Sequence, residues 1–348
     1  MIPNESNFIK NLYKKKQEVE KIMNIQKPIT INQLTIKNRL VLPPMAVAKA
    51  GASDEASDKV IDYYSQRAKL GGIGLIITEH LYIHKQGKAH PGQMSIATDD
   101  TAGSFVRLTD AVHTKGVKIF AQLSHAGTAA SKSITGAVPV GPSPMFHPTQ
   151  RKELPEELTK DQIQEIVHSF TDAAIRAKNA GFDGVEIHSA HGYLLNQFYS
   201  PLYNHRTDEY GCDTMENRIR MHLEIIQSIR GSLGTEYPIA IRMGGCDYQE
   251  GGTSVADTIE ACKLLEKSGI DLLDITGGMN GFIRPGHTEA GYFRDISTAV
   301  KEQLDIPVLL TGGVKSAEDA EALLQEQCAD MIGIGRILLK DPQALHLS

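Results

Sequence analysis

Short apolar runs recur along the chain, each following a small residue at the end of an amphipathic stretch. Four versions of this pattern occupy residues 70–77, 180–187, 268–275 and 328–334. Three further runs lie between them at residues 117–123, 238–243 and 307–310, and residues 39–44 begin the series. Strands that are apolar throughout are typical of a parallel sheet covered on both faces. The pattern therefore predicts eight such strands.

The stretches between these strands are amphipathic. Residues 160–179 are the clearest case, with one helical face formed by Ile163, Ile166, Val167, Phe170 and Ala174. Strict alternation of helix and strand indicates a parallel sheet, and eight units favour a closed (β/α)8 TIM barrel over an open doubly wound sheet. We expect residues 25–348 to form this barrel as one α/β domain.

Two segments fall outside the repeat. Residues 1–24 carry a rough apolar stripe at Phe8, Leu12, Val19 and Met23, which predicts a helical extension packed against the base of the barrel. Residues 124–158 are too many for an ordinary connection and contain several prolines. We expect this segment to form a lid or hairpin over the mouth of the third strand.

Composition narrows the class of protein. The formal net charge of −6 is modest, and the only cluster of like charge is Lys14-Lys15-Lys16, so neither a nucleic-acid nor a membrane partner is indicated. No signal peptide or membrane-spanning run is recognisable, which favours the cytoplasm. The widely spaced cysteines predict reduced thiols and no metal or disulfide framework: Cys212, Cys246, Cys262 and Cys328.

Glycines follow the last two predicted strands. Gly312 and Gly313 come after the seventh, where Ser316 is a candidate helix cap with Asp319 as its capping-box partner. Gly335 and Arg336 open a helix after the eighth. Backbone N–H groups, helix N-termini and an arginine at this end of a barrel are typical of a phosphate site. The phosphate could belong to a sugar phosphate or to FMN.

Two histidines and a tyrosine follow the fourth strand. His188, His191 and Tyr193 would meet at the barrel mouth, where imidazoles can hold a carbonyl oxygen and a phenol can donate a proton. A purely structural role for such histidines is the competing interpretation. The next polar residues are expected to anchor the loop that carries the site: Asn204, Arg206, Asp208, Tyr210, Asn217 and Arg218.

Together these motifs resemble the Old Yellow Enzyme family of FMN-dependent ene-reductases, also called the NADH:flavin oxidoreductase family. The resemblance covers about residues 28–342. It rests on segments 34–45, 122–127, 188–211 and 216–218, on Ile241-Arg242, and on the glycine segments 311–313 and 333–336.

The resemblance implies a role for each matching residue. Gln122 would bond the pyrimidine edge of the flavin, and Arg242 would stabilise negative charge near N1 and O2. His188 and His191 would bind the substrate carbonyl, hydride would pass from flavin N5, and Tyr193 would protonate the neighbouring carbon. The remaining flavin contacts would come from Pro44, Met45, Ala46, Gly312, Gly313, Gly335 and Arg336.

The chain departs from the family pattern at two positions. Ala46 stands where many relatives carry Cys or Thr, which implies a different flavin potential. His80 stands where the family usually has a small residue, and it either adds a donor near flavin O4 or turns away to a backbone partner, which we slightly favour.

The end of the chain and one loop also bear on specificity. The sequence stops soon after Pro342, which implies no iron-sulfur or nucleotide domain, no C-terminal arm reaching a neighbour, and a soluble electron donor. The loop at residues 277–287 is the expected specificity loop, where Arg284 and His287 could contact the substrate or simply face solvent.

We therefore expect a single barrel with FMN that reduces an electron-poor C=C bond in a small α,β-unsaturated carbonyl compound, using NADH or NADPH. Three alternatives remain: an NAD(P)H:flavin reductase or diaphorase without a dedicated alkene, a flavin-binding redox sensor that does not turn over, and a sugar-phosphate barrel without flavin. Gln122 and Arg242 argue against the last. A homo-oligomer is left open.

Overall fold

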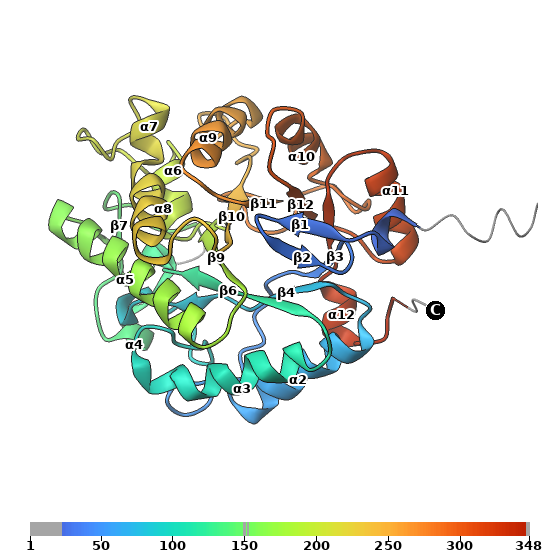
Figure 1. Cartoon of the computed structure of the whole chain (residues 1–348). Helices are drawn as coiled ribbons and strands as arrows, with labels where there is room; N and C mark the ends of the chain where they lie inside the picture. The colour runs from blue at the N-terminus through green and yellow to red at the C-terminus, as the bar shows by residue number, and fades with distance from the viewer. Residues whose placement is uncertain (1–22, 149–150, 152, 346–348) are drawn as a thin grey trace, which may run out of the picture.

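The computed structural model describes residues 23–148, 151 and 153–345. Eight parallel strands form a closed ring, because β4 pairs with both β3 and β6 and β13 pairs with β3 (Figure 1). The eight predicted strands are confirmed. They are β3 Leu40–Leu42, β4 Leu75–Ile77, β6 Lys118–Ser124, β9 Gly184–Ser189, β10 Ile239–Gly244, β11 Leu272–Thr276, β12 Val308–Thr311 and β13 Met331–Gly333.

Helices surround this ring (Figure 1). The longer ones are α2 Asp58–Leu70, α3 Ala102–His113, α5 Lys160–Asn179, α8 Arg220–Leu233, α9 Val255–Lys267, α10 Arg294–Lys301 and α11 Ala317–Gln325, and a short helix, α12 Arg336–Lys340, follows the last strand. The α5 helix has the predicted bounds because Thr159 and Gln162 form a reciprocal capping box at its start and its apolar face is buried. The fold class is therefore the predicted (β/α)8 barrel.

The barrel interior is built in layers. Its lowest layer is apolar, and a hairpin of β1 Ile29–Ile31 and β2 Leu34–Ile36 adds Ile31 and Ile36 to it, which closes the N-terminal end of the barrel. The strand residues of this layer are Val41, Leu75, Ile77, Phe120, Ala240, Leu272, Leu309 and Met331. The buried polar side chains of Gln122, Glu186, Arg242 and Asp274 lie further along their strands, toward the carboxyl ends.

Of the helical extension predicted at residues 1–24, only residues 23 and 24 lie within the described part of the chain. Residues 1–22, which carry most of the predicted helix, lie outside the described residues. Met23 is exposed, and Asn24–Gln26 forms a short 3-10 turn, η1. The side chain of Asn24 and the backbone N–H of Ile25 both donate to the Glu321 carboxylate on α11, each at 3.0 Å.

The segment after β6 is not a hairpin. Its two short strands, β7 Val140–Gly141 and β8 Glu156–Glu157, pair in parallel, and a hairpin would make them antiparallel. The segment also contains η4 Gly127–Ala129 and α4 Lys132–Thr135. Arg206 fastens it to the loop after β9, with Nη1 donating to the carbonyl oxygen of Leu158 at 2.6 Å.

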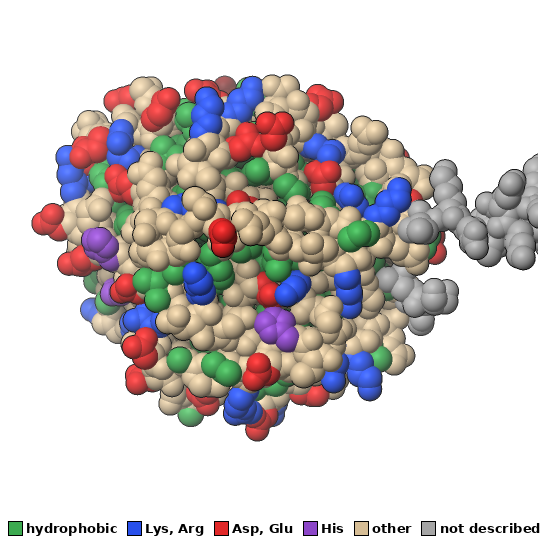
Figure 2. Space-filling model, in the orientation of Figure 1, with side chains coloured by type: hydrophobic (Ala, Val, Ile, Leu, Met, Phe, Trp, Pro, Cys, Tyr) green, Lys and Arg blue, Asp and Glu red, His purple; other side chains and the backbone are tan. Residues whose placement is uncertain are grey.

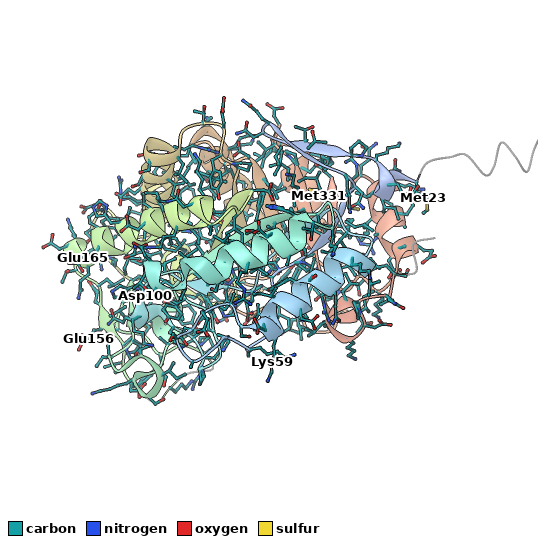
Figure 3. All side chains as sticks on the ribbon, turned by 60° about the horizontal axis from the view of Figure 1, so that its bottom comes forward. Met23, Lys59, Asp100, Glu156, Glu165 and Met331 are labelled. Carbon is teal, nitrogen blue, oxygen red and sulfur yellow. The ribbon has the colours of Figure 1, made fainter. Side chains whose placement is uncertain are left out.

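The remaining short elements are β5 Leu81–Tyr82, which pairs with β6, and η2 Lys85–Gly87, η3 Asp99–Thr101, α6 Leu194–Tyr199 and α7 Met215–Arg218. Met331 lies inside the barrel, whereas Lys59, Asp100, Glu156 and Glu165 lie on its surface (Figure 3).

Acidic and basic side chains are interspersed over the face shown in Figure 2. The four cysteines are free thiols. None of the described helices has the length and apolar character needed to cross a bilayer.

Candidate active site

The candidate site lies at the carboxyl ends of the strands. After β9, His191 and Gly192 both adopt positive φ, +59° and +74°, which turns the chain back over His188 before α6 begins. A Cβ on Gly192 would lie 2.5 Å from Nε2 of His147, so glycine is required there. The turn places the ring centroids of His191 and Tyr193 at 5.2 and 5.1 Å from that of His188. The three predicted residues therefore form one cluster.

Each histidine of this pair faces a partner on another strand. His191 Nε2 lies 3.0 Å from Oγ1 of Thr276 at the end of β11, and His188 Nδ1 lies 3.4 Å from the amide Nε2 of Gln122 on β6. Burial lowers the pKa of both imidazoles well below the usual value, with nearby charges acting in the same direction. Both rings are therefore neutral at pH 7. Sequence reasoning missed Thr276, because nothing in the chain marks it as opposite His191.

His80 faces the site. Its Nε2 lies 3.3 Å from the Tyr193 hydroxyl, and its ring packs edge-on against Tyr193 and His90. The imidazole therefore has a side-chain partner, Tyr193, in place of the backbone partner that we slightly favoured. The backbone carbonyl of His80 already accepts from Gln93. Burial lowers the pKa of His80 to about 3 and raises that of Tyr193 to about 12, so His80 is neutral and Tyr193 protonated near neutral pH.

A buried polar layer lies between the apolar floor and the histidines. Gln122 Nε2 donates to Oε1 of Glu186 on β9 at 2.9 Å. Arg242 Nε on β10 lies 3.0 Å from Oδ2 of Asp274 on β11, without the alignment of a hydrogen bond. Thr311 on β12 donates its hydroxyl to the other Asp274 oxygen at 3.1 Å. The layer thus contains two carboxyl groups and one guanidinium.

The loop after β3 is held by Glu79. The Glu79 carboxylate, fully buried at the end of β4, accepts from the backbone N–H groups of Val47 and Ala48 at 2.9 and 3.2 Å. Burial raises the pKa of Glu79 to about 7. Pro44, in the same loop, accepts a 3.4 Å contact from Arg242 Nη1. Sequence reasoning missed Glu79, although a carboxyl group ending an apolar strand was a signal for it.

The predicted phosphate end is assembled, but the protein itself also requires its glycines. A Cβ on Gly313 would lie 2.2 Å from the carbonyl oxygen of Glu289, and one on Gly335 would lie 2.8 Å from Sδ of Met45. Arg336 Nη2 lies 3.4 Å from the Tyr292 hydroxyl. The rings of Tyr292 and Phe293 would also meet a Cβ on Gly312. The glycines therefore do not by themselves identify a ligand.

The predicted cap of α11 forms, but the capping box does not close. Ser316 Oγ accepts from the Asp319 N–H at 3.1 Å. The Asp319 carboxylate accepts from the backbone N–H of Lys315 at 2.9 Å and not from Ser316.

The loop after β11 brings a different residue to the site from those predicted. Arg284 donates to the carbonyl oxygen of Tyr292 at 2.8 Å and to Asp295 at 3.0 Å, so it anchors the loop. His287 is paired with Glu289 on the surface at 2.6 Å. Phe282 instead reaches the site, with its ring centroid 6.0 Å from that of His191.

The polar residues after Tyr193 anchor the loop as expected. Asn204 donates to the carbonyl oxygens of Phe198 and Tyr210, and Arg218 donates to that of Tyr199 and pairs with Asp257. A loop with satisfied polar anchors keeps the side chains above it in place.

Comparison with known proteins identifies the family. The model of the NADH:flavin oxidoreductase / NADH oxidase family matches residues 24–346. The chain belongs to this family. It is 40% identical over 322 residues to an NADH oxidase of Thermoanaerobacter brockii, covering 90% of this chain and 48% of that protein. The chain thus spans about half the length of that relative.

Two further comparisons extend over nearly whole chains. An NADPH dehydrogenase of Bacillus subtilis is 37% identical over 322 residues, with 90% of this chain and 91% of that protein covered. The solved structure of the old yellow enzyme homologue from Zymomonas mobilis superposes with a TM-score of 0.80 at 29% identity, over 92% of this chain and 90% of that one. The expected resemblance is confirmed, and with it FMN as the cofactor of the family.

The residues present fit the flavin that this NADH:flavin oxidoreductase family uses. Buried Arg242 makes two polar contacts with described residues, from Nε to Asp274 and from Nη1 to the carbonyl oxygen of Pro44. Its remaining N–H groups can donate to a negatively charged ring edge. The amide Nε2 of Gln122 is already committed, and its Oε1 makes no hydrogen bond within the described chain, so it offers an acceptor to a ring N–H. The polar layer therefore presents both a cationic and an accepting group toward the mouth.

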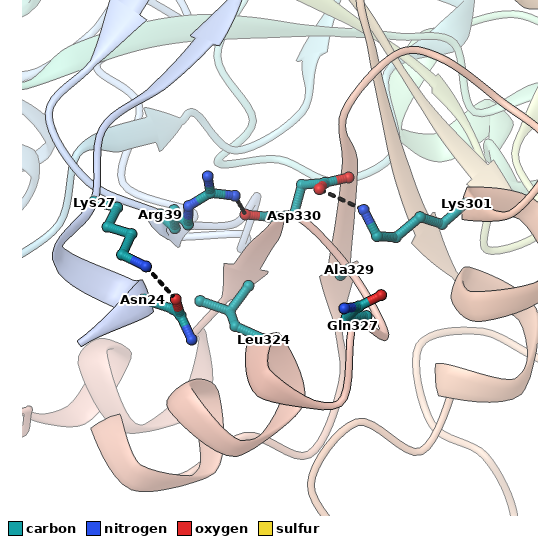
Figure 4. Close-up of a pocket in the computed structure, with 8 residues that line it drawn as sticks. All are labelled: Asn24, Lys27, Arg39, Lys301, Leu324, Gln327, Ala329 and Asp330. Carbon is teal, nitrogen blue, oxygen red and sulfur yellow. Dashed lines mark hydrogen bonds and ion pairs between the residues drawn. The ribbon is translucent and has the colours of Figure 1, made fainter. Parts of the chain in front are cut away.

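A cavity of about 200 Å³ lies at the other end of the barrel of this family member (Figure 4). It is lined by residues that precede strands or end helices, including Arg39 before β3, Lys301 at the end of α10 and Asp330 before β13. These positions mark the N-terminal ends of the strands. The cavity contains none of the predicted site residues.

Proposed function

We propose that this protein binds FMN and reduces an activated C=C bond of an α,β-unsaturated carbonyl compound with NADH or NADPH. The observation that carries the proposal is the cluster of His188, His191 and Tyr193 beside Gln122 and Arg242, with His188 3.4 Å from the Gln122 amide and opposite Arg242 in the register of β9 and β10. Two neutral imidazoles beside a protonated phenol suit a substrate that must be held by its oxygen and protonated on carbon. When bound, FMN supplies the transfer of an electron pair from the nicotinamide to the alkene.

The histidines would hold the carbonyl oxygen of the substrate. Each ring is neutral and therefore has one N–H to donate. In His188 the Gln122 amide N–H points at Nδ1, which makes Nδ1 the acceptor and leaves the proton on Nε2, where it can reach a substrate oxygen. Donation to that oxygen withdraws electrons from the conjugated double bond and stabilises negative charge that develops on oxygen.

Tyr193 would be the proton donor. Its raised pKa keeps the hydroxyl protonated over the whole neutral range, and His80 at 3.3 Å can hold the hydroxyl in place. Arg242 would stabilise negative charge on the cofactor from below. Phe282, which is 59% exposed beside His191, would give the mouth an apolar wall and favour substrates with an apolar or aromatic body.

The deciding experiment is Tyr193→Phe assayed without oxygen. Alkene turnover should fall by roughly 10²- to 10⁴-fold, the usual contribution of general acid catalysis, while the rate at which NAD(P)H bleaches the flavin stays near that of the wild type. Tyr237→Phe is the matched control, because it removes a buried tyrosine hydroxyl bonded to the carbonyl oxygen of Phe182, just before β10.

The same assay separates the alternatives. Unchanged alkene turnover in Tyr193→Phe would contradict the assigned proton donor. NAD(P)H oxidation that free flavin or oxygen stimulates as well as any enone would favour a flavin reductase or diaphorase. A purified protein that is colourless after incubation with FMN and removal of the unbound FMN would rule out each proposed function that needs bound flavin, including a redox sensor.

A further inference from the structure

The buried polar layer contains one more acidic group than basic groups. Arg242 is 3% exposed, and Glu186 and Asp274 are fully buried, so none of the three charges is screened by water. With both carboxyls ionised, the layer would carry a net negative charge directly beneath a site that has to accept an electron pair. An unpaired carboxylate in a dry interior is strongly unfavourable, and a buried group in that position keeps its proton instead.

The geometry shows which carboxyl holds the proton. Asp274 has the stronger set of partners for a negative charge: Arg242 Nε at 3.0 Å and the Thr311 hydroxyl at 3.1 Å. Glu186 receives one neutral amide N–H from Gln122 at 2.9 Å, and its Oε2 has no hydrogen-bond partner within the described residues. The charged groups that act on Glu186 are Arg242 from the neighbouring strand β10 and Asp274 from β11, one strand further along the barrel.

We propose that Asp274 is the ionised counter-ion of Arg242, that Glu186 is held as a neutral carboxylic acid, and that Asp274 therefore sets the electron affinity of the bound flavin through Arg242. Asp274 is thus a positioning residue, since it acts on the cofactor through the guanidinium. The inference depends on the proposed function in one respect: it requires that FMN binds next to Arg242.

The pKa shifts of the two carboxyls agree with this assignment. Burial raises the pKa of Glu186 well above its usual value, and the neighbouring Asp274 raises it further. Burial also raises the pKa of Asp274, but Arg242 and the Thr311 hydroxyl oppose that change and leave it at about 6. At pH 7.5 the pair therefore carries one negative charge. Below about pH 6 this charge is titrated, and the net charge beneath the cofactor becomes more positive.

Two isosteric substitutions in the same layer test the proposal. In the FMN-loaded protein at pH 7.5, Asp274→Asn should shift the two-electron midpoint potential in the positive direction, because an uncompensated Arg242 favours the reduced, negatively charged ring. Glu186→Gln should leave the potential where it is in the wild type, since one neutral acceptor replaces another. Wild-type potential should rise more steeply as the pH falls toward about 6, where Asp274 takes up a proton when the flavin is reduced, and this extra slope should be absent in Asp274→Asn.

Infrared spectroscopy gives a readout that needs no flavin. The wild type at pH 7.5 should show the C=O stretch of a protonated carboxylic acid that Glu186→Gln lacks and Asp274→Asn retains. Equal shifts of potential in the two variants, or a Glu186→Gln variant that loses no carboxylic acid band relative to the wild type, would overturn the assignment. Failure to bind FMN would instead refute the proposed function and leave the infrared test of the two carboxyls standing.

Discussion

Single residues of the site are held by partners on other strands. Thr276 is 1% exposed and its hydroxyl lies 3.0 Å from His191 Nε2, while His191 itself has a φ of +59° that costs free energy for a residue with a side chain. An unfavourable backbone conformation such as this one persists only where contacts with neighbouring residues stabilise it. We therefore expect the orientation of the His191 ring to depend on the Thr276 hydroxyl.

Thr276→Val tests this dependence. It keeps the shape of the side chain but removes one hydrogen bond, worth about 1 kcal/mol. A phenol, whose oxygen the two histidines would hold in place of the substrate carbonyl, should therefore bind roughly fivefold to tenfold more weakly. The measurement is a titration of the FMN-loaded protein with a phenol, followed by the change in flavin absorption. Thr276→Ser retains the hydroxyl and should bind phenol like the wild type. Equal affinity for all three proteins would show that Thr276 does not orient His191.

Ala46 offers a second test at the residue scale. Its side chain is exposed at the barrel mouth and cannot form a hydrogen bond. Ala46→Thr adds a hydroxyl that can reach the ring, whereas Ala46→Val adds the same volume without one. We expect the flavin midpoint potential to shift in Ala46→Thr relative to Ala46→Val. Identical potentials in the two variants would mean that position 46 does not contact the cofactor.

The residue-scale predictions from sequence succeeded where the site is local in the chain. His188, His191 and Tyr193 lie within six residues, so one tight turn was enough to bring them together. Partners from other strands, such as Thr276, could not be predicted, because their distance from His191 along the sequence does not indicate that the two residues are in contact. The partner of the His80 imidazole could not be predicted for the same reason, because Tyr193, which lies 3.3 Å from it, comes from another strand's loop.

At the scale of elements, the hairpin at the base was within reach of the sequence. Residues 29–36 alternate apolar and polar side chains around Asn32-Gln33, and Asn32 adopts the positive φ of +55° that a tight turn requires. The segment does not follow the eightfold repeat, because no helix comes after either of its strands. The segment 124–158 was correctly separated from the repeat, but its parallel β7–β8 pairing depends on loop contacts that its sequence does not encode locally.

The hairpin makes a quantitative prediction. Ile36 is fully buried in the interior cluster, and its neighbour Thr35 is exposed on the other face of β2. Ile36→Ala should lower the free energy of unfolding by about 2–5 kcal/mol, the range for a buried aliphatic side chain that leaves a cavity. Thr35→Ala should change it by less than about 0.5 kcal/mol. Urea unfolding of the two variants side by side measures the difference. A small effect of Ile36→Ala would mean that the hairpin does not close the barrel.

At the scale of the whole molecule, the eightfold repeat made the barrel predictable, because each unit carries the same pattern of apolar strand and amphipathic helix. What the repeat could not reveal is how many ionisable groups the finished barrel buries. Burial lowers the pKa of His80, His125 and His222 to about 3 and that of His147 to about 4. Fewer carboxyls are shifted upward by burial: the pKa of Glu79 is raised to about 7, that of Asp274 to about 6, and that of Glu186 well above its usual value.

These shifts predict a barrel that is sensitive to acid. A histidine whose pKa is lowered on folding contributes its full stability above the unfolded value of about 6.5 and loses it as the pH falls toward the folded value. The raised carboxyls act oppositely, since their contribution is largest at low pH and is lost as the pH rises toward 7. Because more histidines than carboxyls are shifted, the free energy of unfolding should fall between pH 7.5 and pH 5.

His222 isolates one such contribution. It is fully buried beside Ser189, with Nε2 2.7 Å from the hydroxyl, and at pH 5 it is protonated only in the unfolded chain. This difference corresponds to about 2 kcal/mol. Between pH 7.5 and pH 5, the free energy of unfolding of His222→Gln should therefore fall by about 2 kcal/mol less than that of the wild type. Urea unfolding at the two pH values measures this difference, and a cost of the substitution that is the same at both values cancels. His168→Gln, at an exposed position on α5, should follow the wild type, and parallel behaviour of all three proteins would show that neutral His222 is not a source of the acid sensitivity.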